Sequence, residues 1–174
     1  MLEMHVRSDP AAIRQPAVST VRRAAAVTGL VALALAMPGM ATAGAPCRPV
    51  ENLDSILRPA TTLLLGELHG TRESPAFVLD VACHAAQADL PVVVGLELRP
   101  EGQTRVDRFL DSQGTDEDRV ALLAGPTWQA SYQDGRNSQA MYELIDGLRR
   151  LRSTGARVGI ALFDASGAGG GQQR

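Results

Sequence analysis

Apolar residues change their spacing several times along the chain, and these changes predict alternating strands and helices. Residues 61–65 and 92–98 are short apolar runs bounded by turn-forming residues, which is typical of strands buried on both faces. Between them, residues 73–87 repeat apolar side chains at helical spacing, from Phe77 to Ala85. Because a helical crossover joins the two runs, the pattern predicts a parallel, right-handed βαβ unit.

Shorter elements extend the same architecture after residue 98. A helix that carries Val106, Phe109 and Leu110 is expected first. A second helix is expected to begin at Thr115, the N-cap, with Asp118 at the N3 position. The remaining predicted elements are a lead-in helix at 52–57, a polar loop at 126–136, a helix at 138–152 and a strand at 158–163. The fold class is therefore α/β, a parallel β-sheet built from βαβ units with flanking helices.

Residues 1–43 have the organisation of a secretory leader, and residues 1–21 show no convincing periodicity. Arg22 and Arg23 precede an uncharged apolar stretch over residues 24–37, and Ala41-Thr42-Ala43 places small residues where a signal peptidase cuts. A transmembrane anchor is the alternative, but the stretch is too short for a hydrocarbon core of about 30 Å. The predicted domains are a leader at 1–43 and an α/β domain at 44–174, periplasmic or secreted and without a stable membrane span after cleavage.

The charged residues argue against some classes of partner and of chemistry. All 17 basic residues are arginines, which stand against 19 acidic residues. Removal of residues 1–43 takes away four arginines and two acids, leaving 13 arginines, 17 acids and a net charge of −4. The absence of lysine excludes Schiff-base chemistry and a P-loop lysine. The absence of a basic stripe argues against nucleic acid as a partner.

The two cysteines, Cys47 and Cys83, allow two interpretations. An exported protein meets an oxidising compartment, so a Cys47–Cys83 disulfide is one prediction. The alternative is that Cys83 is a small buried residue of the core. A disulfide would tie the start of the mature chain to the first long helix.

Polar residues follow each of the three predicted strands. Glu67 and His69 come after the first strand, Glu97 ends the second, and Asp164 follows the third. In open α/β sheets ligands bind outside the carboxyl ends of the strands, so these side chains are expected to meet there. They would hold a divalent metal, with His69, Glu97 and Asp164 as ligands, or act as a general acid and base around a water molecule.

Three arginines near the predicted strand ends are candidates for substrate binding. Arg72 and Arg99 lie just beyond strands, and Arg136 lies in the polar loop that also carries Tyr132. A guanidinium group would hold an anionic group or neutralise the neighbouring acids. The alternative for the loop is that it only caps the following helix, and His84 is interpreted as a packed or solvated histidine.

Two segments of the sequence carry a family resemblance. The segments LLLGELHGTRES, at residues 63–74, and VVVGLELRPEGQTRVDRFLDSQG, at 92–114, resemble the ChaN-like haem-binding uptake proteins. These belong to the broader Tiki and erythromycin-esterase-like superfamily, in which one strand ends in a Gly-Glu-x-His motif and the next ends in Glu. Gly66, Glu67, His69 and Glu97 match that pattern, and the resemblance covers about half of the mature chain.

The resemblance implies two classes of function. Hydrolytic relatives cleave peptide or ester bonds, with or without a metal, and there Glu67, His69 and Glu97 would be the catalytic residues. ChaN-type relatives bind haem in iron uptake without enzymatic activity, and the candidate axial ligands would be His69, Tyr132 and Tyr142. The cofactor is therefore a divalent metal or haem, and the partner is a small-molecule or peptide substrate, or haem itself.

The sequence departs from the hydrolytic relatives in its histidines. Those relatives use a second essential histidine from their C-terminal half, whereas this chain has only His5, His69 and His84. The expected leader would carry His5 away. A glycine-rich segment after Asp164, at residues 165–174, leads into no further element. The sequence thus indicates a truncated α/β domain, with a natural short variant that ends in a flexible tail as the alternative.

Overall fold

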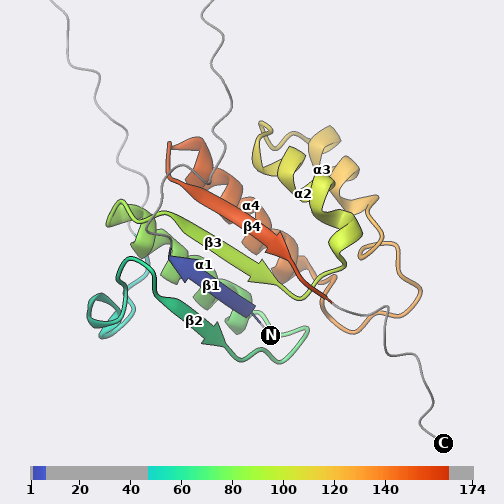
Figure 1. Cartoon of the computed structure of the whole chain (residues 1–174). Coiled ribbons are helices and arrows are strands. Elements are labelled where there is room, and N and C mark those ends of the chain that lie inside the picture. Colours follow the sequence, from blue (N-terminus) through green and yellow to red (C-terminus); the bar gives the residue numbers. More distant parts are fainter. Residues whose placement is uncertain (1, 7–46, 165–174) are drawn as a thin grey trace, which may run out of the picture.

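The computed structural model describes residues 2–6 and 47–164. In this part of the chain a four-stranded sheet lies against a layer of helices (Figure 1). The strands lie in the order β2-β1-β3-β4. Their bounds are Leu2–Val6 for β1, Thr62–Leu65 for β2, Val92–Leu96 for β3 and Val158–Leu162 for β4. The α/β class predicted from the sequence is therefore correct in its coarse form.

The sheet is mixed, which corrects the prediction of a parallel sheet. β3 and β4 are parallel neighbours, but β1 pairs antiparallel with both β2 and β3. β2 and β3 therefore run in the same direction, as the βαβ pattern requires, but they are not adjacent. The helical crossover determines the relative direction of two strands and leaves room for a third strand between them.

β1 is an element that the sequence pattern did not predict. Leu2, Met4 and Val6 are fully buried, whereas Glu3 and His5 between them are only partly buried. This alternation is the pattern of a strand with one face on the core. The imidazole Nδ1 of His5 lies 2.7 Å from the hydroxyl of Thr62 on β2. The remainder of the predicted leader, at 7–43, and the glycine-rich tail, at 165–174, lie outside the described residues.

The helices agree closely with the apolar pattern. Their bounds are Glu73–Gln87 for α1, Gln103–Leu110 for α2, Asp116–Leu123 for α3 and Gln139–Ser153 for α4, with short 3-10 turns at Leu53–Ser55 and Pro100–Gly102. The predicted cap of α3 is present as a reciprocal capping box between Thr115 and Asp118. The Ser138 hydroxyl accepts a hydrogen bond from the amide of Met141 at the start of α4.

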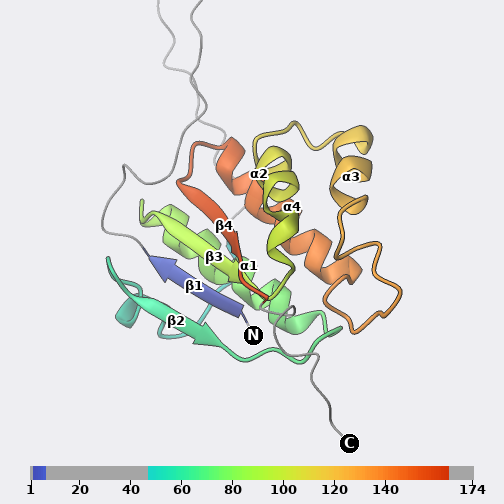
Figure 2. The ribbon, with the colours of Figure 1, turned by 45° about the vertical axis from the view of Figure 1, so that its right-hand side comes forward.

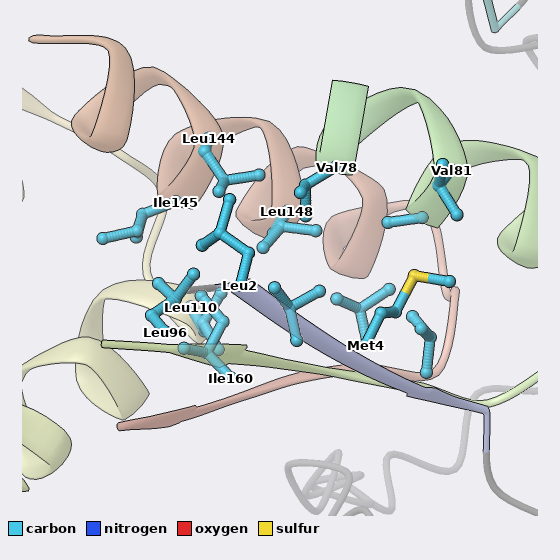
Figure 3. Packing of buried hydrophobic residues seen from close by; sticks show 14 of the residues in the cluster. Leu2, Met4, Val78, Val81, Leu96, Leu110, Leu144, Ile145, Leu148 and Ile160 are labelled. Carbon is cyan, nitrogen blue, oxygen red and sulfur yellow. The ribbon is translucent and has the colours of Figure 1, made fainter. Parts of the chain in front are cut away.

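The core lies between the sheet and the two long helices. α1 and α4 cover one face of the sheet, and α2 and α3 lie beyond β4 (Figures 1 and 2). Figure 3 shows Leu2 and Met4 of β1 pointing toward α1 and α4, into the same layer as Leu144 and Leu148. Phe77, which was expected on the buried face of α1, is 43% exposed.

Outside the sheet, one covalent link joins the segment before β2 to α1. Cys47 and Cys83 form a disulfide with a Cα–Cα separation of 5.7 Å. Next to it, the imidazole of His84 hydrogen-bonds the carbonyl of Arg48 at 2.9 Å, and Arg48 forms an ion pair with Asp80 at 3.0 Å. His84 is thus a packing histidine, as interpreted from the sequence. Within the described residues, no helix is both long and apolar enough to cross a membrane.

Candidate active site at the carboxyl ends of the strands

Glu67 and His69 lie in a short turn between β2 and α1. The backbone amide of Thr71 donates to the carbonyl of Leu68 at 3.2 Å, and its hydroxyl donates to the same oxygen at 2.8 Å. Gly70 has a φ of 82°, a left-handed conformation that glycine adopts without steric cost. These contacts close a tight turn that holds the imidazole beside the end of the sheet.

Glu97 and Asp164 are brought together by the parallel pairing of β3 and β4. Beyond the last paired residues, the amide of Phe163 donates to the carbonyl of Leu96 at 3.1 Å. The amide of Asp164 donates to the carbonyl of Leu98 at 3.0 Å. The two chains thus stay side by side past the end of the sheet, which places both carboxylates at the same edge.

His69 and Glu97 are in direct contact. Nε2 of His69 lies 3.7 Å from Oε2 of Glu97, and both side chains are partly exposed, at 27% and 31%. The two residues lie in the segments that follow β2 and β3, and β1 separates these strands in the sheet. A carboxylate beside an imidazole orients the ring, as in acid–base catalytic pairs.

Arg136 connects the carboxylates of the site. Its Nη1 lies 3.0 Å from Oδ2 of Asp164 and 3.5 Å from Oε1 of Glu97. Its Nε also donates to Oδ2 of Asp134 at 2.8 Å. The hydrogen bond that Arg136 donates to the Asp134 carboxylate raises the pKa of Arg136 and lowers the pKa of Asp134. The guanidinium is therefore a fixed positive charge among three acids.

The pKa of Glu67 is shifted in the opposite direction to that of Asp134. Burial raises its pKa above the ordinary value of 4.5, and the nearby charge of His69 offsets part of that rise. Its Oε2 atom is fully buried. A carboxyl group that keeps its proton to higher pH is suited to act as a general acid.

A polar pocket of about 390 Å³ opens on this edge of the sheet. Glu97, Arg99 and Asp164 supply its wall at the strand ends, and residues of the loop at 126–137, including Tyr132 and Arg136, supply the rest. Glu67 and His69 are not among its lining residues, and His69 adjoins the pocket through Glu97. The pocket thus has one carboxylate that is in contact with the imidazole.

The loop at 126–137 contacts the His69 turn directly. A Cβ atom placed on Gly135, whose φ is 94°, would lie 2.4 Å from the backbone nitrogen of Gly70 and 2.8 Å from the carbonyl carbon of His69. Only a glycine permits this approach, which positions the neighbouring Arg136 over Glu97 and Asp164. The prediction that the loop only caps the following helix is therefore incomplete.

The three predicted substrate-binding arginines have different positions. Arg99 and Arg136 line the pocket, whereas Arg72 is the N-cap of α1 and is not a lining residue. Asp134 was expected only as part of the polar loop, without a role of its own. In the structure its carboxylate folds back and accepts hydrogen bonds from Arg136, two residues later.

The predicted metal-ligand set does not assemble as one. Within residues 2–6 and 47–164, no group of three or more His, Cys, Asp or Glu side chains is arranged to hold a metal ion. The guanidinium of Arg136 stands between Glu97 and Asp164, and a divalent cation there would repel it. His69, Glu97 and Asp164 therefore do not fit a metal in this arrangement.

The residues named for haem are also dispersed. Tyr142 packs against Phe109, with ring centroids 6.1 Å apart, and the guanidinium of Arg119 lies 4.8 Å from its ring centroid. It is a packing residue on α4. Tyr132 does line the pocket and is 78% exposed. The charged and polar walls of the pocket suit a polar ligand better than the apolar face of a porphyrin.

Comparisons of this chain with protein-family models, with curated proteins and with solved structures find no match. The ChaN-like resemblance therefore stays a prediction. The function is therefore argued from the geometry of Glu67, His69, Glu97 and Arg136 at one edge of the sheet.

Proposed function

We propose that this protein is an exported hydrolase of ester or peptide bonds that activates water with a carboxylate–imidazole pair. The observation that carries the proposal is the contact between His69 and Glu97 at the wall of a polar pocket. The expectation of a metal-assisted reaction is not taken further, because Arg136 stands where the acidic ligands would bind the ion.

Each side chain has a separate role in the proposed reaction. Glu97 orients His69, and the imidazole takes a proton from the water molecule that attacks the carbonyl carbon. The protonated imidazole then gives this proton to the leaving group, and Glu67, whose pKa is raised by burial, lies in the electrostatic field of His69 and supports the pair. The oxygen that becomes negative in the tetrahedral intermediate is stabilised by a guanidinium at the pocket, from Arg99 or Arg136.

The proposal predicts a large loss of rate when the pair is broken. Glu97→Gln keeps the size of the side chain and removes its charge, so kcat should fall by about 10²- to 10⁴-fold, the usual contribution of acid–base catalysis. Rates are measured with a panel of p-nitrophenyl esters and a panel of quenched fluorescent peptides. Glu101→Gln, an exposed position four residues further along, is the matched control and should leave the rate unchanged.

Two results would contradict this function. One is the absence of hydrolysis above the buffer rate with both panels. The other is equal kcat for wild type and Glu97→Gln while the thermal unfolding of both is unchanged, because Glu97 would then take no part in the reaction.

A further inference from the structure

β1 fills a slot between two strands that belong to the rest of the domain. It pairs with β2 through Leu2 to His5 and with β3 through Leu2 to Val6, antiparallel on both sides. Among the described residues, β2 has no other sheet partner. Without β1, two parallel strands would face each other across a gap one strand wide, with free backbone donors and acceptors on both sides.

The slot has a defined chemistry. Positions 2, 4 and 6 point to the layer between α1 and α4, where Leu2, Met4 and Val6 are fully buried (Figure 3). Positions 3 and 5 point to the other face of the sheet, where Glu3 and His5 are partly buried. An occupant therefore needs an extended segment of about five residues, apolar at alternate positions and tolerant of polar residues between them.

β1 is connected to the rest of the described domain only through residues 7–46. The cleavage site predicted after Ala43 lies within that connection. A single cut there would make β1 a separate peptide without breaking any element of the described domain. Strand pairing would then be an intermolecular interaction, and its occupant would be exchangeable.

We propose that the slot between β2 and β3 is a binding site for an extended peptide strand. β1 fills it in the intact chain, and a separate peptide with the same alternation fills it once the chain has been cut between residues 6 and 47. Backbone hydrogen bonds on both sides provide affinity, and the three inward positions provide selectivity.

Occupation of the slot also sets the geometry of the candidate active site. Leu2 pairs with Leu65 at the end of β2 and with Leu96 at the end of β3. Those residues directly precede the segments that carry Glu67 and Glu97. The strand in the slot therefore fixes how far the His69 turn lies from Glu97. This second consequence rests on the proposed function, whereas strand binding does not.

The test uses the full chain with a specific protease recognition sequence inserted after Ala43. Binding of a fluorescent peptide of residues 1–8 is followed by anisotropy before and after cutting. The cut protein should bind this peptide and its Glu3→Gln version equally, and Met4→Asp should bind about 100-fold more weakly or worse, because it would bury an unpaired carboxylate. The uncut protein should not bind, since its slot is filled.

Each other outcome also decides the matter. Two further results would support the proposal. One is that the N-terminal fragment still co-elutes with the cut protein in gel filtration. The other is that a cut protein which has lost the fragment, and with it part of its ellipticity, regains that ellipticity with the unsubstituted peptide and not with the Met4→Asp peptide. The proposal is overturned if the cut protein releases the fragment and neither binds nor is refolded by the peptide. The proposal is also overturned if the unsubstituted peptide binds the cut and the uncut protein equally, or if the Met4→Asp peptide binds the cut protein as tightly as the unsubstituted peptide does. None of these measurements depends on hydrolysis, so failure of the hydrolase proposal is a separate result.

Discussion

The two halves of the sheet are held together in different ways. β3 and β4 are parallel neighbours, and helices α2, α3 and α4 lie between them in the chain. Glu97 and Asp164 lie just beyond their carboxyl ends. β1 and β2 are antiparallel, with 55 residues between them in the chain, and Glu67 and His69 lie in the segment that follows β2. The candidate site spans both halves, so its geometry depends on the one strand that joins them.

The difference shows that, among the described residues, the pairing of β3 with β4 does not involve β1, whereas the place of β2 in the sheet depends on it. The segment between β3 and β4 forms helices α2, α3 and α4, and α2 and α4 pack against β4, so these two strands pair directly within one packed unit. β2 reaches the rest of the sheet only through β1 in the described residues, with the Cys47–Cys83 disulfide as the nearby covalent tie to α1. Changes in β1 should therefore act first on the Glu67 and His69 side of the site.

The largest expected effect comes from a charge placed inside β1. Met4→Asp would put an unpaired carboxylate at a fully buried position between α1 and α4, so the free energy of unfolding should fall by more than about 4 kcal/mol. Glu3→Gln, at the neighbouring outward position, should change it by less than about 0.5 kcal/mol. Urea unfolding measures both, and equal stability of Met4→Asp and wild type would show that residues 2–6 are not in the core.

The sequence predicted the elements whose pattern lies within their own segment, and it did not predict β1, for a physical reason. The predicted bounds of the first long helix, residues 73–87, match α1, because its apolar face and its turn boundaries are encoded within the segment itself. β1 is five residues long, alternates apolar residues with Glu3 and His5, and has partners more than fifty residues away. Pairing at such a distance leaves no local signal beyond the alternation.

The candidate site shows the same division. The strand-end rule located Glu67, His69, Glu97 and Asp164 at one edge of the sheet. It could not show that Arg136, from a loop between two helices, would stand among the acids and replace a cation there. That contact depends on the close approach of Gly135 to Gly70, which no spacing in the sequence reveals.

A smaller effect, confined to the junction between the halves, is expected at Gly135. Gly135→Ala would place a Cβ atom 2.4 Å from the backbone of Gly70 and should cost about 1–3 kcal/mol, while moving Arg136 away from Glu97. Gly155→Ala is the matched control, since Gly155 has a φ of 96° and open space where its Cβ would lie. Thermal unfolding and ester hydrolysis measure both variants. A Gly135→Ala protein as stable and as active as Gly155→Ala would contradict the described loop contact.

The smallest effect is a change in how stability depends on pH. Because the pKa of Glu67 is higher in the folded chain than its ordinary value of 4.5, the folded state holds this proton more tightly than the unfolded state. Stability should therefore fall as pH rises from about 4.5 through the folded pKa, and stay at the lower value above it. Glu67→Gln should remove that fall, and the exposed Glu51→Gln should keep it. Unfolding by urea at a series of pH values gives the comparison, and parallel profiles for wild type and Glu67→Gln would refute the shift.

Amide hydrogen exchange on the intact chain, with Met1 retained and the disulfide formed, tests most directly whether β1 joins the two halves. The amides of Leu2–Val6 that pair with β2 and β3 should exchange as slowly as the paired amides within β3. The amides of Thr62–Leu65 that donate to β1 should also be protected. Exchange of residues 2–6 at the rate of an unfolded peptide, with β3 still protected, would contradict the central role of β1.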